Sequence, residues 1–166
     1  MPNIKRRCKA KEITMDIQKF LIERNVPFTS HVHPPAYTSQ EIAACEHVSG
    51  KMVAKTVVVR HDGHYAMCVL PADAMLDMKR TARAFGAETI ELADEMEMAG
   101  LFPEEEIGAE PPFGNLYDMQ TVVDCHLAED DEIVFQAGSH RRAIRMRYED
   151  YAKLAQPRMD SITTRP

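Results

Sequence analysis

Residues 53–70 read VAKTVVVRHDGHYAMCVL, and this stretch decides the predicted fold. Residues 53–60 are rich in β-branched side chains, which are typical of a strand. Asp62-Gly63 is a strong signal for a tight hairpin turn, and residues 65–70 predict the returning strand. The sequence therefore predicts an antiparallel hairpin near the middle of the chain.

Helices and further strands flank this hairpin on both sides. The stripe of Ile17, Phe20, Leu21 and Ile22 predicts a helix over residues 15–24. A capping-box pattern at 38–41 predicts a second helix to about residue 47. Beyond the hairpin, the pattern predicts helices at 76–85, 94–99 and 148–155 and strands at 89–93, 117–123, 132–136 and 143–147. Hairpins with scattered helices indicate an α+β fold, with a mixed or antiparallel sheet that curves into a partial barrel.

The chain of 166 residues suits a single domain, and we see no internal repeat or linker. Residues 1–14 carry five basic side chains against Glu12 alone, and they predict a flexible basic arm. We expect one domain over residues 15–156 and a C-terminal tail over 157–166.

The charge is distributed unevenly. The formal net charge is −6, and because the arm carries +4, the rest of the chain carries −10. Clustered Lys and Arg drive phosphate binding, so this body is a poor non-specific binder and we expect no DNA partner. The alternating Arg141, Arg145 and Arg147 share one face of the predicted strand. They either contact phosphates or form a solvated strand face.

The four cysteines are spread along the chain without a C-x-x-C pair, which argues against a disulfide framework. We expect reduced thiols in a cytoplasmic protein. No apolar run approaches the roughly 20 residues that a membrane-spanning helix needs, so we expect no membrane association.

Lys55 is the most informative single residue. Strand alternation places it in one row with Val53, Val57 and Val59. An unpaired ammonium buried in such a row is costly. The lysine either extends to water at the edge of the sheet or serves as a cation inside a pocket, where it binds a phosphate or polarises a carbonyl.

Two further segments contain candidate site residues. Residues 108–114 read GAEPPFG, in which the prolines stiffen the loop and the glycines permit positive φ and close approach of a ligand. Such a loop is either an anion or carbonyl site or an ordinary surface turn. His140 follows Gly138-Ser139 at a predicted turn, where a histidine is either a proton carrier or simply solvated.

The sequence gives little support for a metal site or for a nucleotide-binding motif. His31 and His33, with Asp124 and His126 far along the chain, have ligand-type side chains, but H-x-H spacing is common by chance. We expect no metal and no other cofactor. The chain lacks the G-x-S-x-G, P-loop and G-x-G-x-x-G patterns, which argues against a serine hydrolase of that type and against the corresponding nucleotide-binding folds.

Several short motifs, in order, resemble the YbaK/prolyl-tRNA synthetase-associated editing domain family. The matching pieces are His33 with the helix at 38–44, VAKTVVV at 53–59, VLPAD at 69–73 with LDMK at 76–79, Gly108 and Pro112 of a G-x-x-x-P loop, and FQAGSH at 135–140. Each motif is weak alone, and together they cover roughly residues 15–155.

The resemblance implies a mixed α/β fold around a curved, barrel-like sheet, and hydrolysis of the ester that joins a wrong amino acid to tRNA. It implies catalytic roles for Lys55, Gly108 and His140. It implies a substrate pocket that is formed by His33, Ala109, Glu110, Pro111, Pro112, Gly138 and Ser139. Because many relatives have small or hydroxylic residues at 109–111, Glu110 is either a difference in the pocket or a side chain that points outward.

The expected protein is therefore a free-standing deacylase that edits in trans. The expected partners are the aminoacylated acceptor end of tRNA, bound with Arg141, Arg145 and Arg147, and an aminoacyl-tRNA synthetase. Alanine or cysteine on proline tRNA is the best-known substrate class of the family, and serine or threonine esters are alternatives. A non-catalytic protein that binds tRNA ends, a nucleotide or a partner on the same fold is the alternative function.

Overall fold

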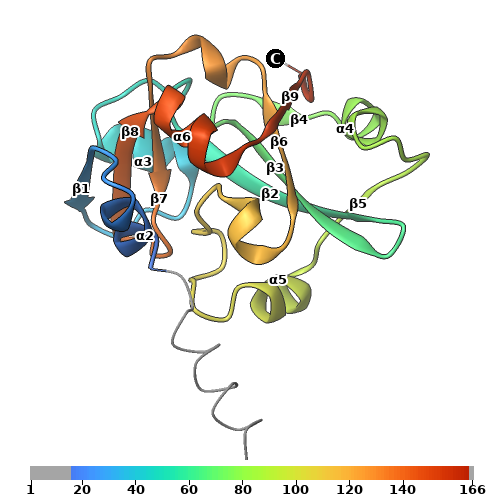
Figure 1. Ribbon diagram of the computed structural model, residues 1–166, viewed down its shortest axis with the longest axis horizontal. Helices are drawn as coiled ribbons and strands as arrows, with labels where there is room; N and C mark the ends of the chain where they lie inside the picture. The colour runs from blue at the N-terminus through green and yellow to red at the C-terminus, as the bar shows by residue number, and fades with distance from the viewer. Residues whose placement is uncertain (1–15, 165–166) are drawn as a thin grey trace, which may run out of the picture.

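The computed structural model describes residues 16–164 (Figure 1), so the predicted basic arm at 1–14 lies outside the described residues. The α-helices are α2 (Ile17–Glu23), α3 (Ser39–Cys45), α4 (Met78–Ala84), α5 (Glu95–Leu101) and α6 (Tyr148–Ala155). The 3-10 helices are η1 (Gly114–Tyr117) and η2 (Leu127–Glu129). Across 16–164, no helix has the length and apolar character that crossing a membrane requires.

The ten strands in the described part of the chain form three sheets. They are β1 (Phe28–Val32), β2 (Ala54–His61), β3 (His64–Pro71), β4 (Met75–Leu76), β5 (Glu91–Leu92), β6 (Gln120–Asp124), β7 (Glu132–Gln136), β8 (Arg142–Arg147), β9 (Arg158–Asp160) and β10 (Thr163–Thr164). The orders are β5-β2-β3-β6-β9, β1-β8-β7 and β10-β4.

The predicted hairpin is confirmed as the centre of the five-stranded sheet. Strands β2 and β3 pair antiparallel from Ala54–Pro71 to His61–His64. Asp62 and Gly63 both have positive φ, at 49° and 77°, which two-residue turns that match the twist of a hairpin require. Strand β6 then runs parallel to β3. The sheet is therefore mixed.

The α+β class is confirmed, but the barrel is not closed. The antiparallel sheet β1-β8-β7 lies to one side of the hairpin (Figure 1) and is joined to it by a single bridge between Val53 and Val134. Strand β5 pairs with β2 only at Val59 and Arg60, so the N-terminal half of β2 lies at an open sheet edge. This open edge is where Lys55 lies.

The main core contains buried aromatic rings from several elements. The ring of Phe113 packs edge-on against Phe20, Phe135 and Tyr151, with centroids 5.9, 5.7 and 5.1 Å apart. These contacts join α2, β7 and α6 around the loop that precedes η1. The prediction that Ile22 lies on the buried stripe of α2 is wrong, because its side chain is 62% exposed.

Two strands lie in the segment that the sequence predicted to be a tail. Strand β9 pairs parallel with β6, and β10 pairs antiparallel with β4. Ile162, between these strands, is fully buried with Val59 and Cys68. Strand β9 therefore extends the central sheet, β10 completes a separate two-stranded sheet with β4, and Ile162 adds to the core.

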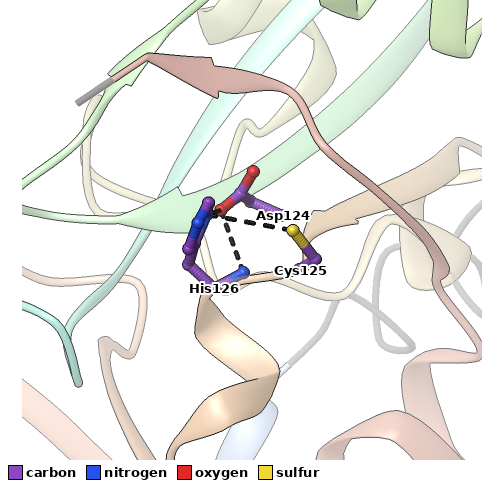
Figure 2. Close-up of side chains that lie close together, drawn as sticks. All are labelled: Asp124, Cys125 and His126. Atoms are coloured by element: carbon purple, nitrogen blue, oxygen red, sulfur yellow. Dashed lines mark hydrogen bonds and ion pairs between the residues drawn. The ribbon is translucent and has the colours of Figure 1, made fainter.

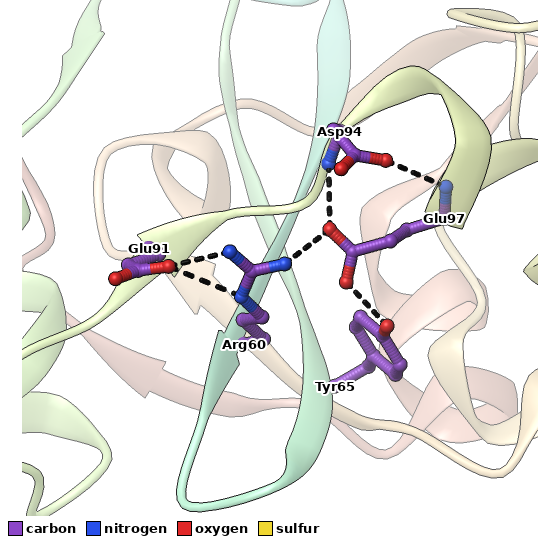
Figure 3. A network of polar contacts seen from close by, with 5 residues as sticks. All are labelled: Arg60, Tyr65, Glu91, Asp94 and Glu97. Atoms are coloured by element: carbon purple, nitrogen blue, oxygen red, sulfur yellow. Dashed lines mark hydrogen bonds and ion pairs between the residues drawn. The ribbon is translucent and has the colours of Figure 1, made fainter.

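A polar network joins the hairpin to α5 and β5 (Figure 3). The Arg60 guanidinium binds Glu91 and Glu97, and the hydroxyl of Tyr65 donates to the other oxygen of Glu97. Glu97 also completes a capping box with Asp94. The hydrogen bond from Tyr65 and those from Asp94 and Arg60 lower the pKa of Glu97 to about 2. The network links residues far apart in the sequence, and none of them lines the cavity beside Lys55.

Candidate functional site

A cavity of about 310 Å³ lies beside the open edge of β2. Its lining comes from the start of α3, the start of β2, the loop after residue 107 and the end of β7. Lys55, Gly108 and Glu110, which the sequence analysis singled out, line it together. The chain thus brings residues from two separate motifs to one polar cavity.

Lys55 is half-buried at this cavity. It lies opposite Leu70 on β3, on the sheet face that also carries Val57 and Val59. Its Nζ donates one hydrogen bond, to the carbonyl oxygen of Ala74 at 2.9 Å. Burial lowers the pKa of the lysine, and the nearby carboxylate of Asp73 opposes this. Lys55 thus lies at a sheet edge and also lines a pocket, and its role as a binding or catalytic cation stays a prediction.

The G-x-x-x-P loop is folded on itself. Gly108 has φ of +92°, and its N–H donates to Oε1 of Glu110 at 2.9 Å. The N–H of Ala109 donates to the carbonyl of Glu106, and the Ala109 carbonyl accepts from Gly138. Two amides that are natural candidates to hold a substrate carbonyl are therefore already engaged in this conformation.

The two prolines of the loop are buried, and they have no N–H to offer a ligand. The carbonyl of Pro112 accepts a hydrogen bond from the buried hydroxyl of Tyr151 at 2.8 Å. Pro112 therefore fixes the loop to α6, and the Pro111 carbonyl accepts from the N–H of Phe113 within the loop itself.

Glu110 points inward. It is 4% exposed, and Oε2 has no hydrogen-bond partner among residues 16–164. Its carbonyl accepts a bond from Thr56 Oγ1 at 3.1 Å. Burial raises the pKa of the carboxyl group, against the lowering effect of the Gly108 N–H. The sequence allowed the Glu110 side chain to lie in the pocket or to point outward, and in the structure it lies in the pocket.

The raised pKa of Glu110 predicts a pH-dependent difference between two proteins. The ordinary pKa of a glutamate carboxyl group is 4.5, and in the folded protein Glu110 keeps its proton to a higher pH than that. As pH rises from about 4.5 through the raised pKa, the buried carboxyl group of the wild type ionises, and the folded state becomes less stable. The Glu110→Gln variant has no proton to lose at this position, so its stability does not fall for this reason. We expect the unfolding free energy of the variant, relative to wild type, to increase over this range in urea titrations. Parallel pH profiles would contradict the assignment.

His140 lies behind the loop. It is buried, and its Nε2 donates to the carbonyl of Ile107 at 2.8 Å, which leaves Nδ1 as a buried acceptor without a partner in the described chain. A Cβ on Gly108 would lie 3.4 Å from its Cε1. The ring also packs against Tyr37, with centroids 4.8 Å apart. His140 thus supports the cavity wall and is not a solvated turn residue.

The remaining predicted substrate residues are divided between two places. His33 is buried but does not line the cavity of Lys55, and its Nδ1 lies 2.7 Å from the Pro34 carbonyl. Gly138 and Ser139 line a second cavity, of about 670 Å³, together with residues of α2. The structure therefore does not bring Gly138 and Ser139 into the cavity of Lys55. The sequence did not single out other residues that line the cavity of Lys55, among them Tyr37 and Gln136.

Of the predicted arginine face, Arg145 and Arg147 lie on β8 and Arg141 directly precedes it. Ile144 and Met146 are buried on its opposite face, as expected. Two of the arginines are already paired: Arg145 binds Glu132 at 2.9 Å, and Arg147 binds Glu149 at 2.6 Å. Arg141 is exposed and has no ion-pair partner within residues 16–164.

A cluster with ligand-type side chains is formed by Asp124, Cys125 and His126 (Figure 2). It includes neither His31, whose Nδ1 binds Glu46 at 2.7 Å, nor His33. The buried carboxylate of Asp124 accepts four bonds. They come from the N–H and Nδ1 of His126, the N–H of Ile162 and the hydroxyl of Thr163.

These four bonds give the cluster a structural role. Asp124 fixes the end of β6 to the segment between β9 and β10, and its oxygens are committed to donors of the protein. The pKa of the Cys125 thiol is raised, by burial first and by the Asp124 charge second, which disfavours the thiolate that binds metals. The cluster therefore fits a fold contact better than a cation site.

Comparisons with known proteins agree with this fold. A model of the aminoacyl-tRNA editing domain matches residues 33–154. The "hypothetical protein APE2540" is similar in structure, with a TM-score of 0.82 at 19% identity over 90% of this chain and 100% of that chain. A candidate trans-editing enzyme for prolyl-tRNA synthetase gives a TM-score of 0.75 at 18% identity over 82% of this chain and 87% of that one. With the family model covering most of its described residues, this chain belongs to the aminoacyl-tRNA editing domain family.

Proposed function

We propose that this protein is a trans-acting deacylase that hydrolyses the ester of a mischarged tRNA. The observation that carries the proposal is the half-buried ammonium of Lys55 in a small polar cavity beside the G-x-x-x-P loop. Nζ donates only one hydrogen bond to the described protein, to Ala74, so two of its three N–H groups are available to a substrate. They would hold the terminal nucleotide or the negative charge that develops on the ester oxygen.

The proposed reaction needs no covalent intermediate. Water adds to the ester carbonyl, the bond to the ribose oxygen breaks, and the proton passes to that oxygen, which yields free amino acid and deacylated tRNA. Glu110 and His140 are inward-facing and buried, so neither offers a solvated base. We therefore assign activation of the water to the neighbouring ribose hydroxyl of the substrate.

The size of the cavity favours a small aminoacyl group. About 310 Å³ is at the lower end of the range of ligand pockets, roughly 300–1,000 Å³. A pocket that excludes the larger cognate amino acid by size provides editing selectivity. Alanine and cysteine esters of proline tRNA are our first candidates, with serine and threonine esters on other tRNAs next.

A panel of mischarged tRNAs tests the proposal. We expect the full chain to release the amino acid from at least one of these small esters faster than from cognate prolyl-tRNA, and to do so equally well with a strong chelator present. The same assay separates the alternative. A folded protein that binds tRNA but hydrolyses no ester would be a non-catalytic binding module, and loss of activity on chelation would indicate a metal-dependent enzyme.

Docking of tRNA is expected to depend on β8 more than on the basic arm. Replacing both Arg141 and Arg145 with alanine should weaken tRNA affinity and flatten its salt dependence by about 0.7–0.9 log–log units per lost phosphate contact. Because Glu132 already binds Arg145, most of the loss should come with Arg141→Ala alone. Affinity against salt concentration, measured for both single variants, the double variant and a chain without residues 1–14, gives the ranking. A larger loss on deleting the arm would contradict it.

A further inference from the structure

Tyr37 is unusual among the aromatic side chains. The chain has five tyrosines, six phenylalanines and no tryptophan, and all eleven rings lie within the described residues. Ten of them are buried or half-buried, whereas Tyr37 is 66% exposed. It also lines the cavity of Lys55. The one exposed aromatic ring of the described chain therefore lies at the candidate site.

The position of this ring is fixed by its surroundings. The backbone N–H of Tyr37 donates to Oε2 of Glu41 at 3.2 Å. The preceding residue, Ala36, is bound on both sides: its N–H donates to the His140 carbonyl at 2.8 Å, and its carbonyl accepts from Gln136 Nε2 at 2.7 Å. Two prolines, at 34 and 35, stiffen the approach.

One part of the ring is packed and the rest is open. The Tyr37 ring lies against the His140 ring with centroids 4.8 Å apart and planes inclined by 45°. The His140 ring is itself held by the Ile107 carbonyl. With 66% of the residue exposed, Tyr37 offers a supported aromatic surface at the rim of the cavity.

We propose that Tyr37 is a stacking platform for the terminal nucleobase of the tRNA acceptor strand. This inference rests on the proposed function, since it assigns the place of the base while the ester enters the cavity. An exposed aromatic ring beside a cation is the arrangement with which proteins bind single-stranded nucleic acid, because every base has a face that stacks. Lys55 supplies the cation in the same cavity, and stacking on Tyr37 leaves the ester free to reach the Gly108 loop.

A binding experiment tests the platform without any hydrolysis. Because the chain has no tryptophan, Tyr37→Trp creates a single tryptophan at the site, whose emission can be excited selectively over that of the four remaining tyrosines. We expect the trinucleotide cytidyl-cytidyl-adenosine to quench its emission saturably, and an abasic analogue of the same trinucleotide to quench it much less. The matched control is Met96→Trp, on the 86% exposed residue of α5, which lies outside the cavity lining and should show no saturable quenching.

A kinetic experiment distinguishes stacking from mere support of His140. On a mischarged tRNA that the wild type hydrolyses, Tyr37→Ala should raise KM by about 5- to 150-fold, the effect of losing one base–aromatic stack, with a smaller change in kcat. Tyr37→Phe should restore the wild-type KM, because the ring is kept. A fall in kcat at unchanged KM would show that the ring only positions His140 and would overturn the proposal.

The outcomes separate this inference from the proposed function. Saturable, base-dependent quenching of the Tyr37→Trp protein supports the platform even if no ester is hydrolysed, in which case only the deacylase proposal fails. If the wild type is active but the Tyr37→Trp protein shows no base-dependent quenching, the platform is overturned and the deacylase proposal stands.

Discussion

Lys55→Ala should lower kcat/KM for deacylation by about 10²–10³-fold, which is the usual effect of removing one preorganised electrostatic contact from a site. The ammonium is half-buried, and Ala74 takes only one of its hydrogen bonds in the described protein. A partly desolvated cation interacts more strongly with developing negative charge than one in bulk water. Single-turnover hydrolysis of the best ester in the panel measures the loss.

Two further variants show that the charge is responsible. Lys55→Met keeps most of the apolar stem that packs along β2, so it should be as inactive as Lys55→Ala while remaining folded. Lys51→Ala removes an exposed lysine four residues earlier and should retain wild-type rates. If folded Lys55→Ala turns over at a near-normal rate, the proposed role of the lysine is wrong.

The features that could be predicted from sequence are those set by neighbours along the chain. The β-branched run at 53–60 and the Asp62-Gly63 turn determine the β2–β3 hairpin locally, and strand alternation placed Lys55 on the face of Val57 and Val59. The positive φ of Gly108 follows from a glycine in a proline-stiffened loop. These features are determined by residues close together in the sequence, so they can be predicted without knowing which distant segments pack against them.

What could not be predicted depends on contacts between distant segments. Glu110 faces inward because the loop folds against residues 138–140, a contact that is invisible in the GAEPP motif itself. Strand β9 has three exposed residues and pairs with β6 through its backbone. No alternation of buried and exposed side chains therefore predicts it. The same holds for Tyr37, whose significance comes only from lying on His140, about a hundred positions later.

Gly108→Val should reduce kcat/KM by about 10²-fold through the backbone of the loop. At φ of +92°, a β-branched residue is strained by roughly 1–3 kcal/mol, and the loop can relieve this strain only by moving. The new Cβ would also lie 3.4 Å from Cε1 of His140, so the added methyl groups must displace that ring or the loop. Displacements of about 1 Å near a reacting ester can cost 10²-fold in rate.

A second glycine separates strain from damage to the site. Gly86, which follows α4, also has positive φ, at +65°, and a Cβ there would meet no atom within 4 Å. Gly86→Val should therefore lose stability by a similar amount and keep its deacylation rate, as urea unfolding and single-turnover kinetics on both variants would show. If Gly108→Val retained wild-type kinetics, the G-x-x-x-P loop would be only a connection between α5 and η1, and the site would have to be built from Lys55 and α3 without it.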